Sequence, residues 1–172
     1  MFDQSAERVK EVAEELNVKP YTSLKELISD VDAVTISATT TAHYELAKEC
    51  LLNNVHVNVE KPMTSTCEQG EELVRIAKEK GLKLQVGHVE RFNPAFQAVQ
   101  SKLNSPLFIE VHRLAPFNPR GADVSVVLDL MIHDIDVVLN LIKEPVKSVS
   151  AVGTPVLTQG VDIANALSLI HI

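Results

Sequence analysis

The stretch DAVTISATTTAHYELAKECLLNNVHVNVEKP at Asp32–Pro62 decides the fold. Its first part, Asp32–Ser37, is typical of a buried strand, and the threonine-rich turn at 39–41 leads into a helix that ends near Asn53. His56–Val59 predicts the next strand. Two short strands that are separated by a long helix indicate parallel pairing through a crossover connection. The stretch therefore predicts a doubly wound α/β sheet of the Rossmann type.

The flanking segments continue the alternation of helices and strands. Residues 5–17 and 23–28 show helical patterns, the second opened by a capping box. After the deciding stretch, 68–80 predicts a third long helix, and Gly81 stands where helices often end with a left-handed residue. Lys83–Val86 predicts a further strand. The parallel sheet is therefore expected to continue past Pro62.

The pattern changes after Pro94, where we place a boundary between a first domain (1–94) and a second domain (95–166). The second part is predicted as a truncated α+β domain with an antiparallel sheet. Its expected elements are a helix at 95–103, an alternating strand at 107–114, an apolar helix at about 125–142, and strands near 147–153 and 162–166.

Both ends of the chain lead us to expect a fragment. A dinucleotide-binding sheet begins with a strand, G-x-G-x-x-G and a helix, yet none of the 6 glycines stands in a G-x-G arrangement. The start, Phe2-Asp3 before a helix, resembles the end of a second strand, although Asp3 could simply cap the helix. LSLIHI at 167–172 matches a translated sequencing adapter, and we expect it to be an artefactual tail. We expect the fragment alone to be inactive.

Composition restricts the class of protein. The chain has 172 residues, 45% of them hydrophobic, and a net charge of -7, which argues against nucleic acid and anionic membrane as partners. The 2 cysteines form no C-x-x-C motif and are typical of reduced thiols. There is no apolar run long enough to span a bilayer and no signal peptide. We expect a cytoplasmic enzyme or binding protein.

Lys61 is the first candidate for chemistry. Glu60-Lys61-Pro62 follows a predicted strand at its carboxyl end, where open α/β sheets bind ligands. A lysine there can hydrogen-bond a substrate hydroxyl and stabilise a developing alkoxide. The alternative is a solvated loop lysine.

The apolar helix carries the stronger signal. Asp129, His133, Asp136 and Asn140 are spaced to form one polar stripe along it. These residue types are poor helix formers, which favours a cleft over an ordinary solvent face. Histidine is the natural proton acceptor near neutral pH, and an aspartate one turn away can contact the same ligand. The stripe lacks the spacing of the common metal-binding motifs, so we expect no metal.

Other polar residues follow strand ends or lie in a proline-rich loop. His43 could line a cofactor pocket or be structural. Arg91 could hold an anionic group of a substrate or pair with a carboxylate, and Arg113 and Arg120 could meet a phosphate or be solvated.

Four motifs in this order resemble the Gfo/Idh/MocA family of oxidoreductases (glucose-fructose oxidoreductase and inositol dehydrogenase) over nearly all of residues 1–166. They are T-x-x-H-x-x-x-A at 40–47, E-K-P at 60–62, V-G-H-x-x-R-F-N-P at 86–94 and D-x-x-x-H at 129–133. The resemblance implies hydride transfer between NAD(P) and a sugar or polyol carbon, and homo-oligomers of the full-length protein.

The resemblance also implies roles for single residues. Lys61 lies beside cofactor and substrate, His133 transfers the proton, and Asp129 is its neighbour. Asp3 binds the ribose, which favours NAD over NADP. The remaining implied contacts are Thr39, Thr40, His43 and Glu60 for the cofactor, and Arg91, Asn93, Arg113 and Arg120 for the substrate.

The stretches 88–96 and 112–136 are most similar to a branch that acts on UDP-N-acetylglucosamine at its C3 hydroxyl. We therefore expect a nucleotide-sugar substrate. The alternatives are a dehydrogenase of a free sugar or polyol such as inositol, and a non-catalytic module that binds sugars or nucleotides.

Overall fold

The computed structural model describes residues 1–103, 106–116 and 124–170 of the chain. They fall into two compact units, and each is described separately. The first unit comprises Met1–Val59 and Thr66–Gln85, and the second comprises Glu60–Ser65 and Val86–Ile172.

The first unit is built on a parallel three-stranded sheet in the order β1-β2-β3. The β1 strand (Ala33–Ile36) pairs with β2 (His56–Val59) in register from Ala33 opposite His56 to Ile36 opposite Val59. The next strand, β3 (Leu84–Val86), lies beyond β2. The parallel pairing confirms the α/β prediction.

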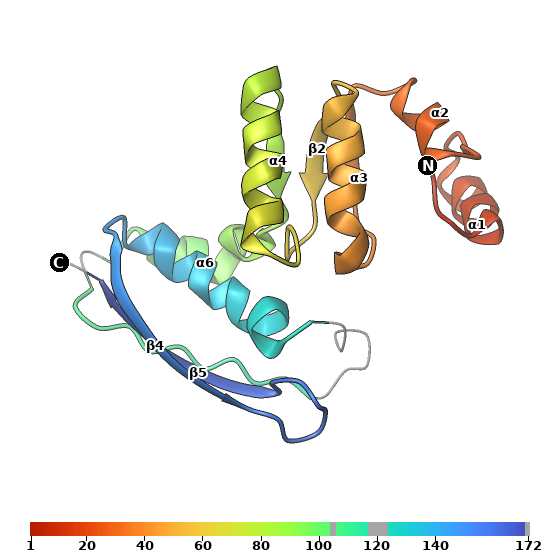
Figure 1. Ribbon diagram of the computed structural model, residues 1–172. Helices are drawn as coiled ribbons and strands as arrows, with labels where there is room; N and C mark the ends of the chain where they lie inside the picture. Colours follow the sequence, from red (N-terminus) through yellow and green to blue (C-terminus); the bar gives the residue numbers. More distant parts are fainter. Residues whose placement is uncertain (104–105, 117–123, 171–172) are drawn as a thin grey trace. The chain divides into compact units, whose positions relative to one another are not determined.

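Four helices belong to this unit, and α3 and α4 lie side by side next to β2 (Figure 1). Their ends follow the local sequence: the hydroxyl of Ser5 caps the first helix, Thr66 caps the fourth, and Gly81 ends the fourth with a φ of 67°. The predicted role of Gly81 is confirmed. The helices are α1 (Ala6–Leu16), α2 (Leu24–Ile28), α3 (Thr40–Leu52) and α4 (Cys67–Lys80).

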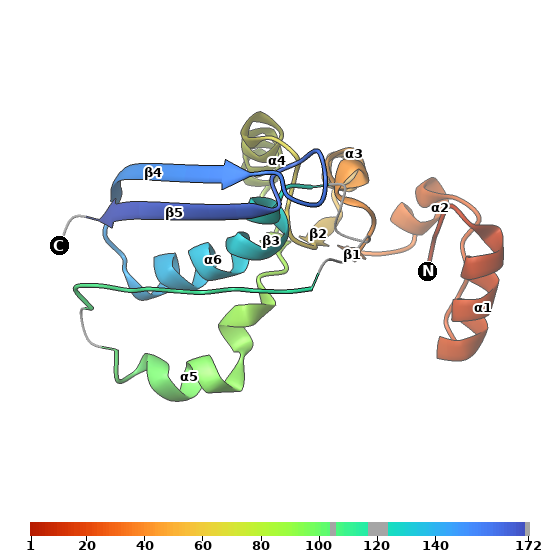
Figure 2. The same cartoon turned by 90° about the horizontal axis from the view of Figure 1, so that it is seen from below.

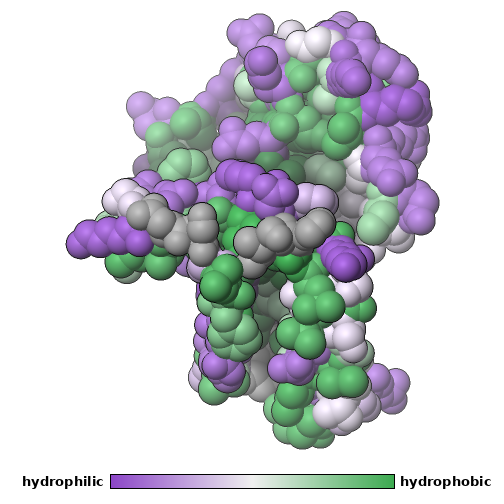
Figure 3. Space-filling view, turned by 90° about the vertical axis from the view of Figure 1, so that its left-hand side faces the viewer, coloured by the Kyte–Doolittle hydropathy of each residue, from purple (hydrophilic) through white to green (hydrophobic). Residues whose placement is uncertain are grey.

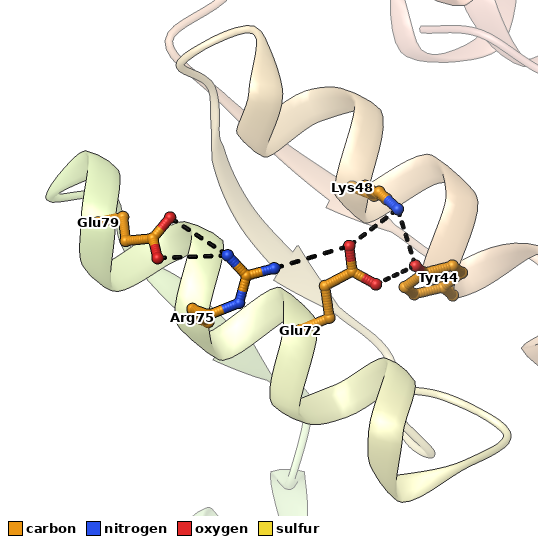
Figure 4. A network of polar contacts seen from close by, with 5 residues as sticks. All are labelled: Tyr44, Lys48, Glu72, Arg75 and Glu79. Atoms are coloured by element: carbon orange, nitrogen blue, oxygen red, sulfur yellow. Dashed lines mark hydrogen bonds and ion pairs between the residues drawn. The ribbon is translucent and has the colours of Figure 1, made fainter.

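The core of the first unit lies between α3, α4 and the sheet. Leu51, Leu73 and Val59 are 0% exposed, and Val55 is 2% exposed. The two helices are also joined by a polar network at the edge of this core (Figure 4). In it the Glu72 carboxylate of α4 accepts a hydrogen bond from Tyr44 and pairs with Lys48 of α3 at 2.9 Å.

Replacing Leu51 by alanine is expected to lower the free energy of unfolding by about 2–5 kcal/mol, because a fully buried leucine leaves a cavity. The neighbouring Leu52 is 50% exposed. Leu52→Ala therefore serves as the matched control and should cost less than about 1 kcal/mol. Urea unfolding of the full-length protein measures both. Equal losses for the two variants would contradict this packing.

The second unit contains helices and an antiparallel hairpin. The segment after β3 begins with the short helix η1 (Val89–Phe92) and α5 (Pro94–Gln100). A π-helical turn, η3 (Val127–Met131), leads directly into α6 (Ile132–Leu141). In Figure 1, α6 runs alongside the hairpin of β4 (Val146–Thr154) and β5 (Ile163–Ile170).

Two expectations for this unit need correction. The alternating stretch 107–114 was predicted as a strand, but residues 106–116 form no strand and run as an extended segment between α5 and the hairpin (Figure 2). Alternation of side chains does not make a strand without a partner to accept its hydrogen bonds, and here β4 and β5 pair with each other. In addition, α5 ends at Gln100 rather than 103.

The hairpin is longer than the sequence predicts. Its second strand extends through Ile170, so that residues 167–170 of the expected tail pair with β4, as in Leu167 opposite Ser150. Many of its apolar side chains are exposed, among them Val149, Val152 and Leu167. Figure 3 shows many hydrophobic residues, coloured green, on the lower part of the face in view. Among the described residues, no helix combines the length and apolar character that a membrane span requires.

Candidate active site

The site is built in the second unit around Lys61. This residue follows β2 by two positions, in the turn Glu60-Lys61-Pro62. Its ammonium group donates to the backbone oxygen of Asp129 at 2.8 Å and to the carboxylate Oδ1 of Asp129 at 2.9 Å. The Lys61 side chain is only 19% exposed. Lys61 is therefore not a freely solvated loop lysine in this structure.

The carboxylate of Glu60 lies close to Gly87. A Cβ atom added to Gly87 would lie 2.9 Å from Oε1 of Glu60, which is closer than carbon and oxygen atoms pack. The turn that carries Lys61 is thus packed against the start of the segment that follows β3. The sequence indicated only that Gly87 closes a strand, and its contact with Glu60 is visible only in three dimensions.

His133 lies in α6, and its Nδ1 atom is buried without a hydrogen-bond partner. Burial lowers the pKa of this imidazole below its usual 6.5, and the positive charges of Lys61 and Arg113 lower it further. Glu90 and Asp134 act in the opposite direction with smaller effect. His133 is therefore neutral at pH 7 and able to accept a proton.

Asp129 lies in the π-helical turn η3, one turn before His133. The sequence predicted Asp129 and His133 to face one ligand from a regular helical stripe. The structure places the Asp129 carboxylate on Lys61. A π turn adds a residue to the helical repeat, so the spacing of the stripe no longer follows a single α-helix. Such turns are frequent at functional sites.

Asp136 is the most buried acid among the described residues of the unit, at 8% exposure. Arg91 holds it with two parallel hydrogen bonds, of which Nε to Oδ2 measures 2.7 Å. The Nδ1 atom of His88 lies 3.9 Å from Oδ1 of the same carboxylate. Of the two interpretations of Arg91, the structure therefore shows pairing with a carboxylate.

The other predicted substrate residues have these positions. Arg113 donates three hydrogen bonds to Asp134, at 2.8 to 3.0 Å, through Nε and Nη2. Asn93 caps α5 by accepting from the backbone of Ala95. Arg120 lies outside the described residues.

The predicted cofactor residues of the first unit gather at β1 and α3, apart from Asp3. Thr39 is the N-cap of α3, but its side chain makes no capping hydrogen bond. Thr40 and His43 are buried, and Nε2 of His43 lies 2.9 Å from the backbone oxygen of Ala38. Asp3 is exposed and accepts a hydrogen bond from the backbone of Ser5.

The helix start at Thr39 suits an anionic or polar ligand. An uncapped helix N-terminus presents backbone N–H groups and a partial positive charge, as dinucleotide sites require. It also follows the carboxyl end of a parallel strand, where such sheets bind their ligands. Residues at this end of the first unit therefore fit a nicotinamide dinucleotide. Within the described ranges, no cluster of three or more histidine, cysteine or acidic side chains offers a metal site.

Fold and site together define a Rossmann-type α/β protein whose second unit carries an ion-paired lysine and a neutral histidine. The chain belongs to the Gfo/Idh/MocA oxidoreductase family, because the sequence model of that family, described by its NAD-binding Rossmann fold, matches residues 1–88. The family expected from the four motifs is thereby confirmed.

Two curated relatives show the range of the family. UDP-N-acetylglucosamine 3-dehydrogenase of Acidithiobacillus ferrooxidans is 40% identical over 167 residues, which are 96% of this chain and 53% of that protein. The scyllo-inositol 2-dehydrogenase (NAD(+)) of Bacillus subtilis is 27% identical, over 95% of this chain and 53% of that protein. The chain spans about half the length of the curated relatives that it matches.

Solved structures agree with the fold. The structure of UDP-N-acetylglucosamine 3-dehydrogenase from Acidithiobacillus ferrooxidans matches with a TM-score of 0.91 at 39% identity, over 98% of this chain and 56% of that one. A probable dehydrogenase from Thermotoga maritima matches with a TM-score of 0.82 at 27% identity, over 96% of this chain and 56% of that one.

Proposed function

We propose that the full-length protein is a nicotinamide-dependent dehydrogenase that oxidises a hydroxyl of a sugar. One observation carries the proposal: the second unit holds both a neutral, half-buried His133 and the ammonium group of Lys61. Oxidation of an alcohol needs a base for the hydroxyl proton and a cation near the oxygen. These two side chains supply both, and the family supplies the cofactor class.

In this reaction, His133 accepts the proton of the substrate hydroxyl. Lys61 donates a hydrogen bond to the same oxygen and stabilises the negative charge that develops there. The Asp129 carboxylate accepts a hydrogen bond from Lys61 and fixes its position. A nicotinamide cofactor would supply the acceptor for the hydride that leaves the carbon. Asp3 favours NAD over NADP, since a carboxylate repels a 2′-phosphate.

For the substrate we propose a UDP-linked amino sugar, oxidised at its C3 hydroxyl. The activity in the name of the relative at 40% identity, a UDP-N-acetylglucosamine 3-dehydrogenase, supports this choice. The guanidinium of Arg113 also supports it. The Asp134 carboxylate takes up Nε and Nη2 of Arg113, so Nη1 remains to donate to an anion. A diphosphate is such an anion.

A free polyol is the second candidate, because inositol dehydrogenases are among the relatives. It also has a structural argument: the paired Arg91 and Arg113 carry little net positive charge toward a diphosphate. A third possibility is a module that binds sugar nucleotides without turnover.

The full-length protein is expected to form NADH when UDP-N-acetylglucosamine and NAD⁺ are present, and to bind UDP alone. NADH absorbance measures the first and calorimetry the second, with free N-acetylglucosamine and inositol as competing substrates. Turnover of inositol without UDP binding at about millimolar concentration, a Kd that corresponds to roughly -4 kcal/mol, would favour the polyol enzyme. UDP binding with no turnover of any sugar would favour the non-catalytic module.

A further inference from the structure

The segment between β3 and α5 contacts both sides of the candidate site. At its start, Gly87 packs against the carboxylate of Glu60, the residue that precedes Lys61. At its other end, Arg91 donates hydrogen bonds to the Asp136 carboxylate of α6. All of these residues lie in the second unit. Residues 87–91 are therefore a short connector between the turn with Lys61 and the helix with His133.

The connector has little freedom of its own. Two successive backbone hydrogen bonds turn it tightly, from His88 N to Val86 O at 2.8 Å and from Val89 N to Gly87 O at 2.9 Å. The helix η1 then presents the Arg91 side chain to α6. A connector that is rigid and held at both ends transmits position from one end to the other.

Asp136 is well suited to hold one of these ends. It lies three residues after His133, which is almost one helical turn, so a shift at Asp136 also shifts His133. Its carboxylate is 8% exposed, whereas Arg91 is 47% exposed. The planar fork of arginine fixes both distance and angle to a carboxylate. Such a pair stabilises little but specifies geometry.

His88 provides a second contact at the same carboxylate. Its Nδ1 atom is buried and has no hydrogen-bond partner, although Asp136 lies within 3.9 Å. A small shift or a water molecule would complete this bond. Asp136 thus faces two residues of the connector, His88 and Arg91.

Resting on the proposed function, we propose that Asp136 is a positioning residue. It acts through Arg91 to hold residues 87–91 against α6, and so sets the separation between Lys61 and His133. Asp136 has no role of its own in the chemistry. Its loss loosens the geometry in which one substrate oxygen can meet both the ammonium group and the imidazole, and misplacement of about 1 Å costs up to 10²-fold in rate.

Asp136→Asn in the full-length protein tests this assignment. The amide keeps the size of the side chain but cannot accept both bonds of the guanidinium. We expect kcat with the sugar substrate to fall about 10- to 100-fold, with the KM for NAD⁺ within about twofold of the wild type. Arg91→Gln should match this loss, and the double variant should be no worse than either, because both remove the same contact.

Glu72→Gln is the matched control. Glu72 is also a half-buried carboxylate with several partners, and it joins α3 to α4 in the first unit (Figure 4). This variant should lose stability but retain kcat. A purely structural role of Asp136 would make Asp136→Asn behave in the same way, with kcat per folded molecule unchanged. If Asp136→Asn does not fold, Arg91→Gln replaces it, since Arg91 is half exposed.

Hydrogen exchange separates this proposal from the proposed function. Amides of residues 88–92 should exchange about 10-fold faster in Asp136→Asn than in the wild type. In Glu72→Gln, the exchange rates of these amides should equal those of the wild type. If the wild type oxidises no sugar, the proposed function is wrong, and unchanged exchange at 88–92 would still overturn the positioning role. If the wild type is active and Asp136→Asn retains its kcat, only the positioning role is overturned.

Discussion

His133→Ala is expected to lower kcat of the full-length protein by about 10²–10⁴-fold, the usual contribution of a positioned general base. The reason is local: burial and two nearby cations keep the imidazole neutral at pH 7. The charge of Lys61 is one of the causes of the lowered pKa of His133, so the two groups act on each other. Initial rates with sugar and NAD⁺ provide the measurement.

The dependence of kcat/KM on pH tests the same role of His133. A base must be unprotonated to act, and the pKa of His133 lies below 6.5. In the wild type, kcat/KM should therefore be constant near pH 7 and fall as the pH drops through that lowered pKa. The variant should lack this acid limb. His112→Ala, at an exposed histidine in the segment 106–116, is the control and should retain both rate and profile. An acid limb that survives in His133→Ala would assign the base elsewhere.

The first unit was predictable because its signals are local. Helix caps such as Ser23 and terminators such as Gly81 act within a few residues, and the structure uses them as the sequence indicates. The strand His56–Val59 has the same bounds in sequence and structure. Alternating strands and long helices then leave few possible topologies.

The second unit was less predictable, because its structure depends on partners distant in the sequence. The stretch 107–114 has the pattern of a strand but pairs with no described strand. Residues 167–170, which we expected to belong to an artefactual tail, pair with β4. The π turn at Asp129 also escapes prediction. Its hydrogen bonds differ from those of an α-helix by one residue, with no change in the apolar pattern.

The candidate site shows the same division. Lys61 and His133 could be singled out, since a strand end and a helical stripe are visible in sequence. The ion pairs of the site could not be predicted: Asp129 lies 68 residues from Lys61, and Asp136 lies 45 residues from Arg91. Sequence chemistry allowed Arg91 two partners, a substrate anion or a carboxylate. The packing of α6 places the Asp136 carboxylate next to Arg91, and this contact is visible only in the structure.

Lys61→Ala is expected to lower kcat by about 10²–10³-fold, the loss seen when one donor to a developing oxyanion is removed. The loss should appear in kcat more than in the KM for the sugar, because the charge on oxygen develops only in the transition state. The truncation also leaves the Asp129 carboxylate without its cation. That carboxylate would then repel the alkoxide, which adds to the effect.

The matched control is Lys48→Ala. Lys48 is likewise partly exposed and pairs with a carboxylate at 2.9 Å, but it belongs to the first unit and contacts Tyr44 and Glu72. Loss of an ion pair alone should therefore leave kcat unchanged in that variant. A small alkylammonium ion added to Lys61→Ala should restore part of the activity, because it can occupy the space between Asp129 and the substrate oxygen. If both variants retain wild-type kcat, Lys61 only secures η3 through Asp129, and the cation that stabilises the alkoxide must be another residue.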